Sequence, residues 1–249
     1  MCLRVLGDQC RGASRFALTC PPLPLRFASA VLLLGLAASA RGQTAASLSA
    51  ESDNRFRGVS LSDAKPDLRL SLAYDHASGW YAGASVTAVE FDSRRRQAAL
   101  FGYVGYARRA VSGLAWEVGA TAARFGDTAH YDYGEMFAGL IAQRWNARAY
   151  FSPSYFGSGA RTAYAELNCG LPLNRQLRLF GHLGALARLT GGTSDDSRRV
   201  RLDARVGIGA AIDPFELQLA WVAGGRSGIY PVPYGPPRDA WVLSAVAYF

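Results

Sequence analysis

Alternation of apolar and polar residues, from Glu51 to the end of the chain, constrains the fold of this sequence more than any other feature. The segment from Leu68 to Tyr74 is typical and reads Leu-Arg-Leu-Ser-Leu-Ala-Tyr. Because successive side chains of a β-strand point to opposite faces, this pattern predicts a strand with one apolar and one polar face. The same test predicts further strands at residues 115–122, 145–152, 162–171, 177–188, 200–212, 215–221 and 241–249. Less regular segments, in which glycine and alanine blur the alternation, fill the gaps at residues 53–60, 80–89, 97–107 and 131–143, which makes twelve predicted strands.

The connections between these strands alternate in length. Short turns fall at residues 77–79, 144, 172–176 and 213–214, and longer polar links fall at 61–66, 90–96, 126–130, 153–159, 191–199 and 224–240. The link at 108–114 stands where a short turn belongs but has seven residues. Short turns on one side and long loops on the other, with an even number of strands, are typical of bacterial outer-membrane barrels. We therefore predict an all-β fold, a closed antiparallel transmembrane β-barrel of about twelve strands (about ten to fourteen), with short periplasmic turns and longer extracellular loops.

The polar face of the strands indicates which side of the barrel faces inward. An isolated charge in a dry core is very costly, and an arginine at the lipid midplane costs roughly 2–4 kcal/mol. Both penalties are avoided if the charged residues line a wet lumen. A soluble ligand-binding barrel, with its apolar face inward, is the alternative, and it predicts extraction into buffer without detergent. The candidates for lining a pore are Arg69, Asp75, Glu117, Arg148, Glu166, Arg178, His182, Arg188, Arg201, Asp203, Arg205 and Glu216.

An export signal is predicted at the N-terminus. Arg26 precedes an apolar stretch, and the small residues at 38–40 complete the pattern of a signal peptide with its cleavage site. We expect residues 1–40 to be removed, residues 41–50 to form a short N-terminal segment and residues 51–249 to form the barrel. Three of the four cysteines leave with the signal, so Cys169 can form no intramolecular disulfide. No Cys/His metal framework can be drawn, and we expect neither a metal nor a cofactor.

The last strand carries the most specific local signal. Trp241, Leu243, Ala245 and Ala247 form an alternating row that ends at the terminal residue, Phe249. This row resembles the C-terminal strand by which the barrel-assembly machinery recognises outer-membrane proteins of Gram-negative bacteria. We assign Trp241 and Phe249 to this assembly signal, and we expect the assembly machinery and outer-membrane lipids as partners.

Two motifs near the start of the barrel indicate a family. The first comprises Phe56, Arg57, Gly58, Ser60 and Pro66, and the second comprises Tyr74, His76, Gly79, Tyr81 and Gly83. Together they resemble the opening of the TorF family of porin-type outer-membrane barrels from proteobacteria. The resemblance implies an outer-membrane barrel of porin type without a defined substrate.

The charge balance bears on the partners. The 27 basic residues, all arginine except Lys65, outnumber the 19 acidic ones but are scattered along the chain, so nucleic-acid binding is not predicted. Rings of basic side chains favour anions in pores. The leading hypothesis is a porin-like passive channel for small hydrophilic solutes or ions. Its anion preference is weak, because carboxylates nearly balance the arginines of the lumen.

Other functions remain open at this stage. Opposite charges on neighbouring strands could pair and fill the lumen, as in small barrels that conduct poorly. An adhesion or structural barrel would fold without conducting. An outer-membrane hydrolase would need a nucleophile with a base in reach, but no serine motif accompanies His76, His130 or His182. We therefore expect no enzymatic activity. No stretch of the sequence marks a subunit interface.

Overall fold

The computed structural model describes residues 42–91, 95–191, 200–224 and 239–249. The predicted signal peptide, residues 1–40, lies outside these ranges. In the part of the chain that is described, no helix is long and apolar enough to cross a membrane.

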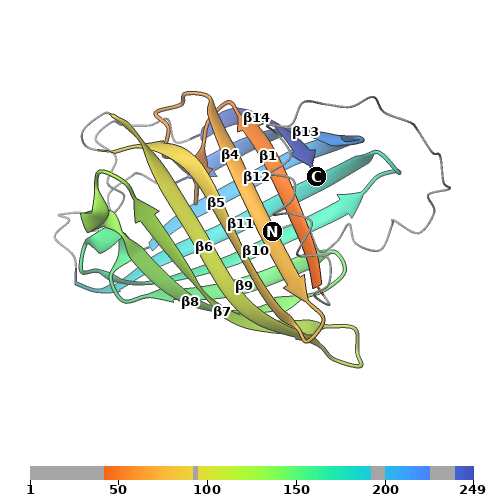
Figure 1. Cartoon of the computed structure of the whole chain (residues 1–249), viewed down its shortest axis with the longest axis horizontal. Coiled ribbons are helices and arrows are strands. Elements are labelled where there is room, and N and C mark those ends of the chain that lie inside the picture. The colour runs from red at the N-terminus through yellow and green to blue at the C-terminus, as the bar shows by residue number, and fades with distance from the viewer. Residues whose placement is uncertain (1–41, 92–94, 192–199, 225–238) are drawn as a thin grey trace, which may run out of the picture. The chain divides into compact units, whose positions relative to one another are not determined.

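Twelve antiparallel strands close into one barrel, as the alternation predicts (Figure 1). Each strand pairs with its neighbours in sequence, and β1 pairs with β14 to complete the ring, with Leu48 opposite Ala247. The barrel strands are β1 (Gly42–Glu51), β4 (Asp67–His76), β5 (Trp80–Glu90), β6 (Arg96–Arg109), β7 (Ala115–Phe125), β8 (Tyr133–Ile141), β9 (Trp145–Ser152), β10 (Arg161–Pro172), β11 (Leu177–Thr190), β12 (Val200–Ile212), β13 (Phe215–Gly224) and β14 (Asp239–Tyr248).

The first strand is not where the sequence predicts it. Residues 53–60 are not a barrel strand. They contain β2 (Arg55–Phe56) and β3 (Val59–Ser60), which form a separate two-stranded sheet. The barrel begins instead at Gly42, so residues 41–50 are not merely a short segment ahead of it. Leu48 is the one large apolar residue of β1, and its small and polar neighbours hide the alternation on which the prediction depends.

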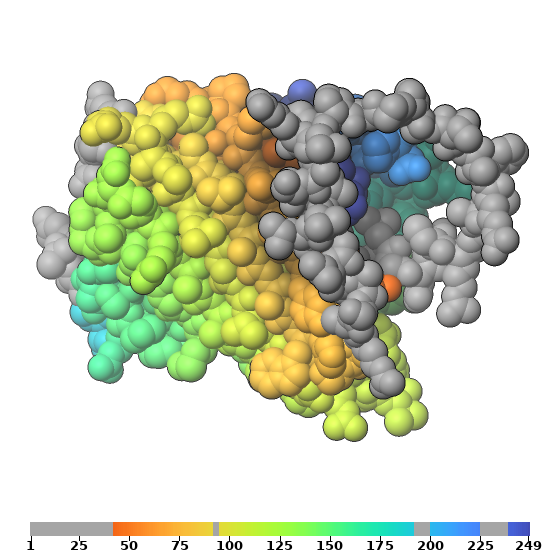
Figure 2. Space-filling model, in the orientation of Figure 1, coloured from red at the N-terminus to blue at the C-terminus, as the bar shows by residue number. Residues whose placement is uncertain are grey.

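The wall turns its apolar residues outward. Leu68, Leu70 and Leu72 of β4 are 62%, 47% and 56% exposed, whereas Glu117 and Arg148 are buried on the inner face. Figure 2 shows the outer face over the first strands, coloured orange to green, where side chains of neighbouring strands cover the wall. This polarity is the opposite of that of a soluble ligand-binding barrel, and it is the polarity of a transmembrane barrel.

The two ends of the barrel differ. One end, called the turn end here, carries the connections 77–79, 110–114, 142–144, 173–176 and 213–214. The seven-residue link predicted at 108–114 is shorter in the structure and closes tightly, because the backbone N–H of Ala110 donates to the carbonyl oxygen of Leu114 at 2.8 Å. The other end, called the loop end, carries the link between β1 and β4 and the short 3-10 helices η3 (Ala129–Tyr131) and η4 (Tyr155–Gly157).

Removing β1 tests its place in the wall. A mature chain that begins at Ser52 leaves one edge of β4 and one edge of β14 unpaired, and in lipid each unsatisfied backbone group costs several kcal/mol. We expect this chain to give no compact, heat-modifiable species in unboiled gel electrophoresis after refolding. The chain that begins at Gly42 is the control. A folded species from the shorter chain would show that β1 is dispensable for closure.

Candidate functional site in the barrel lumen

The twelve charged residues proposed from the sequence as pore-lining all lie on the inward faces of their strands. They alternate with the exposed apolar residues of the outer face. Their strands are β4 for Arg69 and Asp75, β7 for Glu117, β9 for Arg148, β10 for Glu166, β11 for Arg178, His182 and Arg188, β12 for Arg201, Asp203 and Arg205, and β13 for Glu216.

Arg148 and Glu117 form an ion pair that spans an intervening strand. The Nη2 of Arg148 donates to Glu117 Oε2 at 2.9 Å, and its Nε donates to the other carboxylate oxygen. Gly139 of β8 lies between them in the register. A Cβ at Gly139 would stand 2.8 Å from Arg148 Cγ and 2.9 Å from Glu117 Oε1. The glycine therefore lets the two side chains meet over the backbone of β8.

A second ion pair of this kind joins β11 and β13. Arg178 of β11 donates through Nε and Nη2 to Glu216 Oε1 of β13, at 2.8 and 2.5 Å. Gly209 of β12 lies beneath, and a Cβ there would be 2.8 Å from the same carboxylate oxygen. The ring of Phe180 lies beside both Arg178 and Arg205, with its centroid 5.1 and 5.3 Å from their Cζ atoms.

His182 is held in a chain of polar contacts across three strands. Its Nδ1 lies 2.7 Å from Asn168 Oδ1, and its Nε2 lies 2.7 Å from Asp203 Oδ1. The amide of Asn168 is oriented by its own donation to Asn146 Oδ1 at 3.0 Å. Tyr164 donates to the carboxylate of Asp203 at 3.2 Å. Both ring nitrogens therefore lie within hydrogen-bond distance of a side-chain oxygen, which fixes the orientation of the ring.

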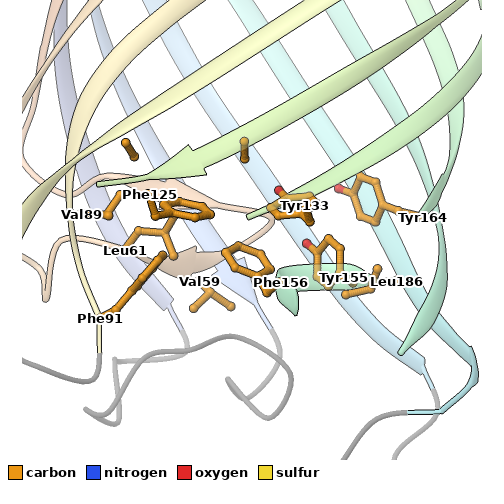
Figure 3. Packing of buried hydrophobic residues seen from close by; sticks show 12 residues of the cluster. Val59, Leu61, Val89, Phe91, Phe125, Tyr133, Tyr155, Phe156, Tyr164 and Leu186 are labelled. Atoms are coloured by element: carbon orange, nitrogen blue, oxygen red, sulfur yellow. The ribbon is translucent and has the colours of Figure 1, made fainter. Parts of the chain in front are cut away.

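A hairpin from the loop end folds into the lumen. Residues 53–62, called the plug hairpin here, contain β2 and β3 and pack with inward-facing aromatic residues of the wall (Figure 3). Phe56 of the hairpin lies 6.3 Å, between ring centroids, from Phe101 of β6 and from Phe156 of η4. The buried cluster comprises Val59, Leu61, Val89, Phe91, Ala99, Ala123, Phe125, Tyr133, Tyr155, Phe156, Tyr164 and Leu186.

Buried polar contacts fix the stem of the plug hairpin. Asp53 accepts from Ser60 Oγ and from Arg55 Nε, each at 2.6 Å. Asn54 donates through Nδ2 to Asp67 Oδ2 at 2.9 Å and accepts from Arg69 Nη2 at 2.9 Å. Because burying such groups without partners is costly, these bonds fix one position of the hairpin against the wall.

The tip of the plug hairpin crosses the lumen. Gly58 has a φ of 77°, and a Cβ there would stand 2.7 Å from Gly224 Cα and 2.8 Å from Asp203 Cβ. The preceding residue, Arg57, donates to both oxygens of Glu135, at 2.9 and 2.7 Å. Burial lowers the pKa of the Arg57 guanidinium, but its interactions with Tyr155 and Glu135 outweigh burial and raise that pKa. Arg57 is therefore a permanent cation that ties the tip to β8.

The plug fills the loop end, where the side chains of Arg57 and Glu135 are 7% and 4% exposed. Toward the turn end, exposure differs around the wall. The side chains of Arg178 and His182 are 28% and 20% exposed, whereas those of Arg148 and Glu117 are 7% and 1% exposed. Within the described ranges, no group of three or more His, Cys, Asp or Glu side chains could hold a metal ion.

A family model described as "Bacterial protein of unknown function (Gcw_chp)" matches residues 37–228. The chain belongs to the Gcw_chp family. None of the curated proteins searched matches it in sequence.

Two solved structures show the same fold as this Gcw_chp chain. "NanC porin structure in rhombohedral crystal form" superposes with a TM-score of 0.57 at 9% identity and covers 83% of this chain and 100% of its own. "KdgM porin" superposes with a TM-score of 0.53, also at 9% identity, and covers 82% of this chain and 99% of its own.

The two sequence motifs occupy different places in the Gcw_chp barrel. Phe56, Arg57, Gly58 and Ser60 belong to the plug hairpin, and the carbonyl of Pro66 accepts from Arg96 Nη2 at 2.8 Å. The second motif lies in β4, the turn after it and β5, where Gly79 has a φ of 102° and Tyr81 donates to Glu117. Its remaining members, Tyr74, His76 and Gly83, lie in the same two strands.

The last strand of the Gcw_chp barrel is paired as predicted from its alternation. Trp241 faces outward, opposite Trp221, and is 68% exposed. The backbone N–H of Phe249 donates to the carbonyl oxygen of Ala46 at 2.9 Å. A role of these two residues in assembly stays a prediction.

Several residues that hold the plug were missed by the sequence analysis. The sequence pattern places Asp53 and Asn54 in a barrel strand, and it does not single out Glu135. Their partners lie up to 98 positions away in the chain, as for Arg57 and Tyr155. The Phe-Arg-Gly motif was the available signal, because a Gly at a hairpin tip permits a positive φ.

The pair of Arg148 and Glu117 gives a test of the inner wall of the Gcw_chp barrel. R148M leaves a buried carboxylate without its cation, so we expect a loss of about 3–5 kcal/mol in the free energy of unfolding. The double variant R148M/E117Q should recover most of that loss. The measurement is urea unfolding in lipid vesicles followed by tryptophan fluorescence. If the double variant loses as much unfolding free energy as the sum of the losses of R148M and E117Q, the pairing is contradicted.

Proposed function

We propose that this member of the Gcw_chp family is an outer-membrane channel for small hydrophilic solutes, with a weak preference for anions and with a plug that narrows its outer end. The observation that carries the proposal is a row of basic side chains along the inner face of β11 and β12. The fold that the chain shares with two proteins named as porins supports a channel. The resemblance of its motifs to the TorF family supports the same function.

The basic row runs the length of the wall. Arg201 lies opposite Leu186 near the loop end, Arg205 lies opposite His182, and Arg178 lies opposite Gly209 toward the turn end. Positions 201, 205 and 209 are four residues apart, which is about 13 Å along a strand. The row therefore spans about 26 Å, close to the height of about 25 Å of the apolar band of a transmembrane barrel. An anion would meet a cationic group at each step.

Acidic residues beside the row limit the selectivity. Asp203 contacts His182, and Glu216 pairs with Arg178. Because these carboxylates offset part of the positive potential, we infer a weak preference rather than exclusion of cations. The sequence-based pore-lining residues are retained in this proposal as the lining of the lumen.

The setting of the channel follows from its outer face. The outward leucines require lipid, and the apolar row at the C-terminus suits recognition by the barrel-assembly machinery. We propose that the chain is exported by a cleaved N-terminal signal and resides in the outer membrane of a Gram-negative bacterium.

A closed structural barrel is the second candidate function. The plug hairpin favours it, because the hairpin fills the loop end of the lumen.

We propose no enzymatic activity. His182 contacts Asn168, Asp203 and Tyr164, none of which is a serine or cysteine nucleophile. His76 Nδ1 lies 2.6 Å from Ser78 Oγ and also accepts from the Ser78 backbone N–H, which is a local contact of an exposed turn.

Reversing the charge of the basic row tests the anion preference. R201E/R205E should move the reversal potential in a salt gradient toward that of a cation-selective pore, measured on single channels in planar bilayers. The matched control is R124E/R161E, which makes the same change of net charge at exposed positions on the outer face of the wall. Equal reversal potentials for R201E/R205E and the unmodified chain would rule out the row as the conduction path.

Removing the plug separates the channel from the structural barrel. Glu51 and Asp67 lie opposite each other in the register, so a short Gly-Ser link can join β1 to β4 in place of residues 53–62. We expect a several-fold larger single-channel conductance, because the loop end is no longer filled. The control carries the same link in place of residues 110–114 at the turn end. A folded, plug-free barrel that remains silent would favour the structural role.

A further inference from the structure

The plug hairpin holds one guanidinium group inside an aromatic cage. The Cζ of Arg57 lies 3.9 Å from the ring centroid of Tyr164 and 4.9 Å from that of Phe56. It lies 5.2 Å from the centroid of Tyr150 and 5.3 Å from that of Tyr155. All four distances are within the range of about 6 Å in which an aromatic face attracts a cation.

A carboxylate completes the cage. Arg57 Nη1 donates to Glu135 Oε1 at 2.9 Å, and Nη2 donates to Glu135 Oε2 at 2.7 Å. The same Nη1 also donates to the hydroxyl of Tyr155 at 2.9 Å. Two parallel bonds to one carboxylate match the planar fork of a guanidinium, whereas an ammonium group donates from a single nitrogen atom.

The cage belongs mainly to the wall and not to the hairpin. Glu135, Tyr150 and Tyr164 come from the consecutive strands β8, β9 and β10, and Tyr155 comes from the η4 segment between β9 and β10. These residues also pack on one another and on Tyr133, with centroids 5.9 Å apart for Tyr150 and Tyr164 and 5.0 Å apart for Tyr133 and Tyr155. Apart from Phe56, the cage is therefore built by elements that do not belong to the hairpin.

The hairpin reaches the cage through an unfavourable backbone. Arg57 has a φ of 48° and Gly58 has a φ of 77°, so two consecutive residues lie in the left-handed region. This conformation is disfavoured for a residue such as Arg57, and it persists where surrounding contacts over-determine it. The cage contacts of the guanidinium hold the tip in this conformation.

We propose that the cage is a binding site for guanidinium compounds. Arg57 of the same chain occupies this site and so holds the plug in the lumen as a latch, and a free solute that bears a guanidinium group competes with Arg57 for it. The ligand class follows from the fork to Glu135 and from the three aromatic faces outside the hairpin, which are those of Tyr150, Tyr155 and Tyr164. The latch makes release of the plug dependent on such a solute. This inference does not rest on the anion preference of the channel.

Chemical rescue tests the site. In the mature chain, R57A empties the cage, and we expect methylguanidinium at millimolar concentration to raise its melting temperature, because a ligand that binds the folded state stabilises it. In R57A/E135Q the apparent affinity for methylguanidinium should fall by at least about tenfold, because a charge-assisted bond pair is lost. R55A is the matched control, since it removes a buried arginine of the same hairpin but leaves the cage filled. An equal effect of methylguanidinium on all three variants would overturn the proposal.

Refolding covers the case in which R57A alone does not fold. The readout is then the folded species in unboiled gel electrophoresis, with methylguanidinium or methylammonium present during refolding. Recovery with methylguanidinium and not with methylammonium supports the site, and recovery with neither overturns it.

Hydrogen exchange of the unmodified chain tests the competition. Methylguanidinium should accelerate amide exchange at residues 55–60, while methylammonium at the same concentration should not. Equal exchange in the two salts would overturn the latch. These readouts are stability, refolding and exchange, so they hold whether or not the barrel conducts.

Discussion

Backbone hydrogen bonds between β1 and β14 join the two ends of the barrel domain, and every inward-facing group depends on this closure. Ser47 to Glu51 pair with Ser244 to Tyr248, and the other edge of β1 pairs with β4 along its whole length. In lipid, an open sheet edge would leave backbone groups without partners. The outward leucines can therefore face lipid only because the ring has no free edge.

Closure creates an interior in which many charged groups are crowded together. The wall accommodates them by pairing side chains two strands apart over a glycine, as Glu117 and Arg148 do over Gly139, and Arg178 and Glu216 do over Gly209. Each pair ties three consecutive strands from the inside. At the loop end the plug hairpin adds a further ion pair, because Arg57 reaches Glu135 on the wall. The interior thus contains several paired charges, and Arg178 and His182 are the more exposed members of these pairs.

The sequence predicted what depends on local periodicity. The alternation from Leu68 to Tyr74 predicts β4, and the inward charges such as Arg201 and Asp203 follow from the same period of two. β1 does not show in the sequence pattern because Ala, Ser and Thr occupy both of its faces. Its side chains alternate between the two faces like those of the other strands, but they do not alternate between large apolar and polar residues. The plug was missed for a different reason. Residues 53–60 alternate only weakly, and the partners that distinguish a hairpin inside a barrel from a strand of the wall are far apart in sequence.

The plug is joined at both ends to adjacent strands, and these attachments limit how far it can move. Glu51 and Asp67 stand opposite each other in the wall, so both ends of the hairpin are anchored to neighbouring points and Arg57 cannot diffuse away. A short tether of this kind presents its end group at an effective concentration in the millimolar range. Loops of about ten residues close in about 10–100 ns. Under the proposed latch, a plug that has left its cage meets it again on this timescale, so its open state is a series of brief intervals rather than a lasting conformation.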